Sequence, residues 1–182
     1  KGRTIATPDT GSYGGYQMQA YELAKAGIRI ADDINLLITG MPHDTALHAV
    51  LEGRADAGFI RTGVLEALIR SGRIEASQVT VLNRKTVPDF PFLLSTGLYP
   101  EWPIAAMPQT DEHLAQDVAK ALFSLQAGHP AARLGQYHGW AIPTDYEPVR
   151  MMMQELRLPP FDQTPHFTWK DILEKHGLII TL

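Results

Sequence analysis

Short apolar runs alternate with helix-like stripes along the first half of the chain. Each run is bounded by glycine, proline or charged residues and has the length of a buried strand. The four runs are Arg3–Ala6, Asn35–Thr39, Asp56–Ile60 and Val79–Leu82. Between them, apolar side chains recur with the spacing of one helix face. Strands that alternate with helices predict an α/β unit with a largely parallel sheet.

Three helices are expected between these strands. The first follows a glycine-rich turn and covers Tyr16–Ala26. The second begins near His43 and ends at Gly53, since glycine is common just beyond the C-terminus of a helix. The third covers Gly63–Arg70 and is closed by Gly72. Together with the strands they give the chain order of a βαβαβαβ unit.

The second half of the chain has a different pattern. Prolines interrupt residues 83–108, which is typical of a connector or hinge, although a proline-rich edge strand would look the same. Thr110–Ala127 then predicts the clearest helix of the chain, with Thr110 as its cap. The expected buried stripe of this helix comprises Leu114, Val118, Ala121, Leu122 and Leu125.

Two more helices are expected towards the end of the sequence. The stretch from Thr144 to Glu147 has the pattern of a capping box. The helix after it would turn four apolar residues inward, which are Val149, Met152, Met153 and Leu156. Thr168–His176 predicts a last short helix. We therefore expect three regions, namely residues 1–85, a connector at 86–108 and a helical segment at 109–182.

Composition narrows the possible functions. The 182 residues carry a net charge of −4 and no dense basic stripe, which argues against a nucleic-acid partner. Cysteine is absent, which excludes disulfides and thiolate metal sites. No apolar run approaches the roughly 20 residues that span a bilayer. The sequence starts at Lys1 without a methionine, so we expect a fragment or a processed product.

The sequence has no signature of a catalytic or metal centre. The seven histidines lack metal-ligand spacing, and no HExxH pattern or GxSxG turn occurs. Paired carboxylates such as Asp32 with Asp33 fit solvated positions better than an acid–base dyad. We expect no cofactor, no metal and no catalytic residue.

The turn after the first strand is the first candidate binding element. It contains Thr10, Gly11, Ser12, Tyr13 and Gly14 and leads directly into a helix. Backbone N–H groups and the positive end of a helix favour an anion at such a turn. The turn matches neither GxGxxG nor a P-loop, so no nucleotide is implied. The alternative is that a hydroxyl of this turn simply caps the helix.

Three further residues come after other strands and share the same sheet edge. His43 comes after the second strand, and Arg61 and Thr62 come directly after the third. In parallel sheets ligands bind beyond the carboxyl ends of the strands. Arg61 could hold a carboxylate or phosphonate with its planar guanidinium, or could instead pair with Asp56 or Glu66. His43 could donate to a ligand oxygen, or could pack locally beside its proline neighbour.

Several longer stretches resemble a known family. They are TPDTGSYGGY, MPHDTALHAVLEGRADAGFIRTGVLEAL, STGLYPEWP and YHGWAIPTDYEPVRMMMQELRLPPF. The first two resemble the second lobe of phosphonate-type periplasmic solute-binding proteins. The later ones resemble the sensor version of this fold, the extracytoplasmic input domain of membrane histidine kinases similar to tetrathionate sensors.

The resemblance implies a type II periplasmic-binding-protein-like lobe in residues 1–85, with the first lobe missing. A small anionic or oxyanion ligand would lie between the lobes, held by the turn after the first strand together with His43, and closure would be the signal. The parent protein would be an inner-membrane histidine kinase, a phosphotransferase, with this domain in the periplasm. Its transmembrane and kinase modules would be the partners, while the fragment itself would not be an enzyme.

Two other functions compete with this interpretation. One is a free solute-binding protein of a phosphonate or phosphate ABC transporter. The gene sequence beyond the codon of Leu182 would separate it from a sensor kinase. The other is a small α/β enzyme, which the missing nucleophile and metal set disfavours and which turnover screening with esters and phosphates would detect.

Overall fold

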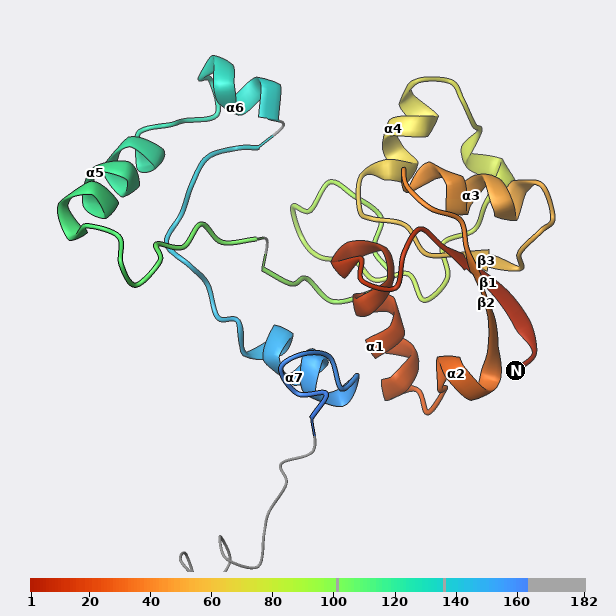
Figure 1. Cartoon of the computed structure of the whole chain (residues 1–182). Helices are drawn as coiled ribbons and strands as arrows, with labels where there is room; N and C mark the ends of the chain where they lie inside the picture. The colour runs from red at the N-terminus through yellow and green to blue at the C-terminus, as the bar shows by residue number, and fades with distance from the viewer. Residues whose placement is uncertain (101, 136, 164–182) are drawn as a thin grey trace, which may run out of the picture. The chain divides into compact units, whose positions relative to one another are not determined.

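The computed structural model describes residues 1–100, 102–135 and 137–163 of the chain (Figure 1). These residues form two compact units, each described by itself below. One comprises Lys1–Leu98 together with the described residues from Pro148 on, and the other comprises Tyr99–Glu147. Among the described residues, no helix is both long enough and apolar enough to cross a membrane.

The first unit is built on a small, wholly parallel sheet. Its strands are β1 (Arg3–Thr7), β2 (Ile34–Ile38) and β3 (Ala57–Gly58), in the order β2-β1-β3. The register pairs Ile5 of the central strand with Leu36 on one side and with Ala57 on the other. Alternating strands and helices predicted a largely parallel sheet, and the α/β class is confirmed; that the first strand lies at the centre is a finding of the structure.

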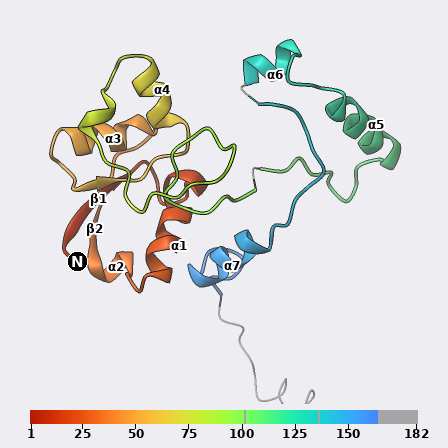
Figure 2. The same ribbon diagram turned by 180° about the vertical axis from the view of Figure 1, so that it is seen from behind.

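Short helices connect and flank these strands. In the first unit they are η1 (Tyr13–Gln17, one π-helical turn), α1 (Met18–Lys25), α2 (Ile30–Asp33), α3 (Asp44–Leu51), α4 (Val64–Arg70) and the 3₁₀ turn η2 (Ala76–Gln78). The remaining helices are α5 (Glu112–Phe123), α6 (Pro130–Gly135) and α7 (Glu147–Glu155). In Figures 1 and 2, which view the molecule from opposite sides, α3 and α4 lie side by side.

The core of the first unit forms on both sides of α3. One side of the helix packs Ala46 and Ala49 against Ala6 of β1 and Ala55, all of them buried. These small residues let the helix approach the strands closely. At Gly58 even a Cβ atom would lie 3.0 Å from the carbonyl oxygen of Ala46.

The other side of α3 joins a larger cluster. Leu47 packs there with Leu65 and Leu68 of α4 and with Ile74, and all four are buried. A helix that contacts both the sheet and a neighbouring helix has little freedom to move, because apolar area is buried along two faces.

The predicted fourth strand is wrong. Residues 79–82 are not paired with another strand, and β3 is only two residues long, shorter than the predicted Asp56–Ile60. Val79 and Val81 still pack against the cluster around Leu68. The two valines are therefore half-buried without forming a strand, and the two-residue β3 offers little edge for another strand to join.

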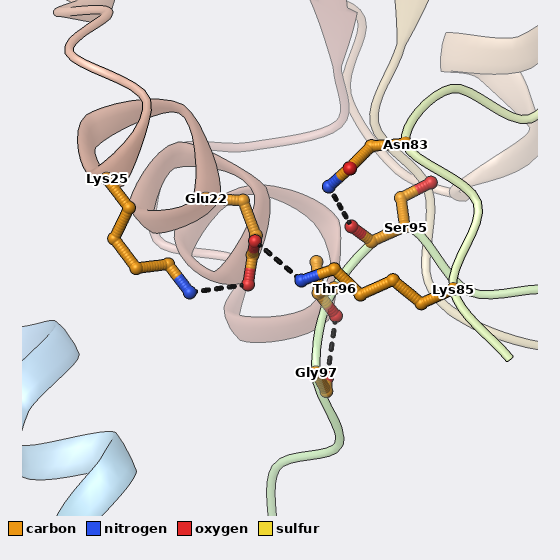
Figure 3. Close-up of polar contacts among 7 residues, drawn as sticks. All are labelled: Glu22, Lys25, Asn83, Lys85, Ser95, Thr96 and Gly97. Atoms are coloured by element: carbon orange, nitrogen blue, oxygen red, sulfur yellow. Dashed lines mark hydrogen bonds and ion pairs between the residues drawn. The ribbon is translucent and has the colours of Figure 1, made fainter. Parts of the chain in front are cut away.

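Within its described residues, the proline-rich segment forms a single bridge and no strand. The N–H of Lys85 donates to the carbonyl of Leu94 at 2.8 Å in an antiparallel pair. Asn83 Nδ2 donates to the carbonyl of Ser95 at 2.9 Å, and Lys85 Nζ donates to Glu22 of α1 at 2.8 Å (Figure 3). The segment that leads out of the first unit is thereby tied to α1.

Helix α5 in the second unit differs from its prediction in two ways. Its cap is Asp111, whose carboxylate accepts from the N–H of Leu114 at 2.9 Å, and not Thr110. Aspartate one residue later takes over because it sits where its oxygen reaches the first free N–H groups. No residue of α5 is buried, and Leu114 and Val118 are 58% and 45% exposed, so the expected buried stripe is wrong within the described chain. The short helix α6 was not predicted.

Helix α7 returns to the first unit and packs as its pattern predicted. Met152 is completely buried, while Val149, Met153 and Leu156 are half-buried. The helix begins at Glu147, whose N–H donates to Asp145 at 2.8 Å, so the capping box assigned to Thr144 is wrong. The last helix predicted, Thr168–His176, lies outside the described residues.

Candidate functional site

The turn after β1 is folded by its own side chains. Thr7, fully buried at the end of the strand, donates its hydroxyl to the carbonyl of Gly15 at 2.8 Å. The carboxylate of Asp9 accepts from the N–H of Gly11 at 2.6 Å, and the N–H of Ser12 donates to the carbonyl of Asp9. Both ends of the turn are therefore fixed before any ligand arrives.

Ser12 caps the helical turn η1. Its hydroxyl oxygen accepts from the N–H of Gly15 at 3.1 Å, so the capping role that the sequence left open as an alternative is real. The same hydroxyl keeps one proton to donate elsewhere. The turn itself is π-helical, with the N–H of Gln17 donating to the carbonyl of Ser12 at 3.0 Å. Single π-helical turns are rare in proteins, and those that occur often lie at functional sites.

His43 is brought to this turn by an extension of the strand pairing. Beyond β2, the N–H of Thr39 donates to the carbonyl of Thr7, and that of Gly40 donates to the carbonyl of Pro8. Thr45 Oγ1 lies 2.7 Å from the carbonyl of Gly40 and ties the start of α3 to the same segment. His43 occupies the N-cap position of α3 directly after it.

The imidazole of His43 lies against Gly15. A Cβ atom on Gly15 would be 2.6 Å from His43 Cε1 and 2.7 Å from Ser12 Oγ. His43 Nδ1 is buried and has no hydrogen-bond partner within the described part of the chain. Burial, followed by the nearby positive charge of Arg61, lowers the pKa of the His43 imidazole below its ordinary value. The ring is therefore held neutral more readily than a free histidine.

Arg61 reaches the turn from β3, the strand on the opposite side of β1 from β2. The N–H of Phe59 donates to the carbonyl of Ala6 at 2.8 Å and so extends the pairing of β3 towards Arg61. A Cβ atom on Gly14 would lie 3.2 Å from Arg61 Cγ, so the arginine stem runs past this glycine. The two acidic residues suggested as its partners have other contacts. Asp56 pairs with Arg3 at 2.7 Å, and Glu66 accepts from the N–H of Leu93 at 2.6 Å.

The structure brings together some of the predicted site residues and leaves others apart. The Gly14–Gly15 pair is contacted by three of the predicted side chains, those of Ser12, His43 and Arg61. Tyr13 is a half-buried member of the same turn. Thr62 is exposed next to Arg61, and no described contact joins it to this group. Hereafter Ser12, Gly14, Gly15, His43 and Arg61 are called the turn cluster.

Thr10 and Gly11 line a separate cavity on the turn. Its volume is about 470 Å³, and its walls combine the turn with the end of α7 and the segment after it. The lining residues are Thr10, Gly11, Tyr16, Gln17, Met153, Leu156, Leu158 and Pro159. Burial raises the pKa of the Tyr16 phenol at its edge.

Two residues of the site were missed by sequence reasoning. Gly15 is the contact point for both His43 and Ser12, and its presence beside Gly14 was the available signal. Gln19 on α1 donates through Nε2 to the carbonyls of Gly14 and Ile60, at 2.9 and 3.2 Å. No local pattern could have indicated Gln19, because Ile60 lies far away in the sequence.

The turn cluster groups side chains that are chemically suited to contact an anion. The stem of Arg61 lies against Gly14, and the imidazole of His43 and the hydroxyl of Ser12 lie against the neighbouring Gly15. His43 Nδ1 has no partner among the described residues, so it forms no hydrogen bond with the Ser12 hydroxyl of the kind a serine nucleophile needs. In the part of the chain that the structure describes, no three His, Asp or Glu side chains are arranged to hold a metal ion.

Comparison with known proteins decides the family. Residues 1–147 match the model of the periplasmic substrate-binding proteins of phosphonate ABC transporters. The chain belongs to this family. Its membership confirms the resemblance predicted from the TPDTGSYGGY turn and the segments after it, and it agrees with the parallel α/β architecture.

A curated relative matches nearly the whole chain. It is the tetrathionate sensor histidine kinase TtrS of Salmonella typhimurium, 30% identical over 179 residues. The match covers 98% of this chain but 29% of the relative, so the chain spans less than a third of that protein's length. The similarity therefore links a phosphonate-binding-type domain to a sensor kinase.

Proposed function

We propose that this chain is part of the extracytoplasmic ligand-sensing domain of a two-component sensor histidine kinase, and that it binds a small anion or oxyanion. The observation that carries the proposal is the meeting of Ser12, His43 and Arg61 around the Gly14–Gly15 pair. It is supported by the family of the chain and by its similarity to a sensor kinase.

The charges of the turn cluster favour an anion. Arg61 supplies a permanent positive charge that already lowers the pKa of His43. A bound anion would reverse this repulsion and would also give the buried Nδ1 of His43 a hydrogen-bond acceptor. Ser12 would add its remaining hydroxyl proton. The Thr10–Gly14 turn and Thr62 complete the proposed ligand-binding set.

We assign residues 1–85 to the second lobe of a two-lobed domain, 86–108 to the connector and 109–182 to a helical segment that returns to the lobes. A first lobe, supplied by another part of the same protein, would close over the ligand and would explain the apolar surface of α5. Large apolar patches on a soluble unit commonly mark an interaction surface. Ligand that binds the closed form better would shift the equilibrium towards closure.

The same proposal extends to the rest of the parent protein. A periplasmic sensing domain would pass its closure to a transmembrane segment and then to a kinase module that transfers phosphate. These modules, like the first lobe, would be parts of the parent chain, and the described fragment would take no part in the chemistry.

The family itself supports a second candidate, a solute-binding protein of a phosphonate-type transporter. The two candidates differ in gene structure. An open reading frame that continues into a membrane span and a kinase module supports the sensor, whereas a solute-binding gene beside transporter genes supports the alternative.

Calorimetry on the complete extracytoplasmic region of the parent protein tests the anion site. Tetrathionate, methylphosphonate, phosphate and sulfate serve as probes. For any probe that binds, we expect the double replacement Ser12→Ala with Arg61→Ala to weaken affinity at least about tenfold, since charge-assisted hydrogen bonds are lost. The matched control replaces Ser77 and Arg70, which are exposed away from the turn cluster, by alanine. Unchanged affinity in the first variant would exclude this site.

A further inference from the structure

Gln19 links two separate segments of the turn cluster. It lies on α1, and its Nε2 donates to the carbonyl of Gly14 in the turn and to the carbonyl of Ile60 after β3. Gly14 and Ile60 are 46 residues apart in the sequence, so Gln19 joins segments that are distant in the chain. Few side chains can join two carbonyls with one nitrogen, and a primary amide can because it carries two hydrogens.

The orientation of this amide is fixed by its partners. Both acceptors are carbonyl oxygens, so an exchange of Nε2 and Oε1 would place oxygen against oxygen twice. Gln19 Oε1 is buried and has no partner among the described residues. A buried acceptor without a partner costs free energy, and the side chain retains it in order to keep both donor contacts.

Both carbonyls belong to residues that determine where Arg61 lies. Ile60 immediately precedes Arg61, and Gly14 is the residue that the Arg61 stem passes, with Cγ 3.2 Å from a Cβ placed there. The Gln19 amide thus sets the separation between the turn and the arginine. It does so from the half-buried side of α1 without occupying the turn itself.

We propose that Gln19 is a positioning residue of the anion site, whose amide holds the Arg61 segment against the turn so that the guanidinium meets a ligand in one geometry. The effect on binding depends on the proposed function. The two hydrogen bonds from Gln19 Nε2 to the carbonyls of Gly14 and Ile60 are hereafter called the Gln19 bracket. The bracket is a property of the free protein and can be measured without ligand.

The replacement Gln19→Met tests both parts because it keeps the length of the side chain and removes its donors. In the complete extracytoplasmic region, with tetrathionate as the calorimetric probe, we expect about tenfold weaker binding. In an Arg61→Ala background the same replacement should cause no further loss, since the residue that Gln19 positions is gone. A loss of equal size in both backgrounds would overturn the proposal.

Gln17→Met is the matched control. Gln17 also donates its amide to a carbonyl of the turn, that of Gly11 at 3.3 Å, but among the described residues its amide is linked to no second segment. We expect the tetrathionate affinity of the Gln17→Met variant to stay within about twofold of that of the unmodified protein. Should both glutamine variants weaken binding alike, general loosening of the turn would explain the effect and the positioning role of Gln19 would be wrong.

Hydrogen exchange of the ligand-free protein measures the bracket directly. Gln19→Met should speed exchange at the N–H groups of Gly15 and Phe59, one on each bracketed segment, and leave those of α3 unchanged. Gln19→Glu, which keeps shape and polarity but loses the donors at neutral pH, should do the same and serves if the methionine variant does not fold. Unchanged exchange at both segments would overturn the bracket. Faster exchange combined with normal tetrathionate binding by the Arg61→Ala variant would retain the bracket and refute the anion site.

Discussion

Helices α3 and α5 have similar amphipathic patterns but very different surroundings. Helix α3, in the first unit, buries Ala46, Leu47 and Ala49 between the sheet and α4. Helix α5, in the second unit, buries none of its residues, and Leu114 is 58% exposed. An apolar stripe therefore indicates a face that can be buried. Whether it is buried depends on a partner surface that the helix itself does not contain.

The largest difference in stability is expected when leucine is replaced by alanine once in α3 and once in α5. In the 182-residue chain, Leu47→Ala should lower the free energy of unfolding by about 2–5 kcal/mol, because it leaves a cavity beside Leu65 and Leu68. Leu114→Ala should change it by less than about 0.5 kcal/mol. Urea unfolding followed by circular dichroism measures both, and equal losses would show that α5 has a partner within this chain. If the chain is part of the longer protein proposed above, a cost for Leu114→Ala in that protein close to that for Leu47→Ala would support a first lobe.

The next effect concerns how tightly the turn cluster is packed. Gly15→Ala would place a methyl group 2.6 Å from His43 Cε1 and 2.7 Å from Ser12 Oγ. We expect a loss of about 1–3 kcal/mol in unfolding free energy together with weaker ligand binding, since both the His43 ring and the capping Ser12 hydroxyl must shift to admit the methyl group. Gly97→Ala is the control, because no described atom lies within 4 Å of its added carbon. Equal tolerance of both would indicate that the turn is loosely packed.

Acidification should weaken the first unit through His43. Burial and Arg61 lower the pKa of His43 in the folded protein, while the unfolded chain keeps the ordinary value near 6.5. As the pH falls through that value, the unfolded state binds the proton first, so stability declines until the folded-state pKa is reached and then levels off. His43→Asn should reduce this loss of stability, measured as urea midpoints between pH 8 and pH 5. The range extends about 1.5 pH units on either side of the ordinary histidine pKa. An unchanged slope would assign the pH dependence to other groups.

The smallest effect is expected at the surface ion pairs. Partial burial alone would raise the pKa of Glu22, but hydrogen bonds and charges from Lys25 and Lys85 outweigh it, and the pKa lies below its ordinary value (Figure 3). Glu22→Gln should cost at most about 1 kcal/mol after solvent screening, and less in high salt. Asp117→Asn, at the exposed pair with Lys120 in the second unit, should have no measurable effect. A larger cost at Asp117 than at Glu22 would reverse the comparison between the two units.

Local signals predicted most elements of the first unit. Gly53 and Gly72 come after α3 and α4 with positive φ angles of 73° and 69°, the backbone conformation for which glycine was expected there. The shared strand edge also predicted that Ser12, His43 and Arg61 would come together. The predicted fourth strand was wrong because a short apolar run contains no information about the length of the strand it would have to pair with.

The sequence by itself determined the first two strands, the approximate positions of α1, α3 and α4, the glycines and hydroxyls of the first turn, and the family that the chain resembles. Only the tertiary structure decided that Gln19 joins Gly14 to Ile60, that His43 lies on Gly15 and that the stripe of α5 stays exposed. The reason is physical. Periodicity, capping and turn preference act over a few neighbouring residues, whereas burial and bridging hydrogen bonds require surfaces that are distant in the chain.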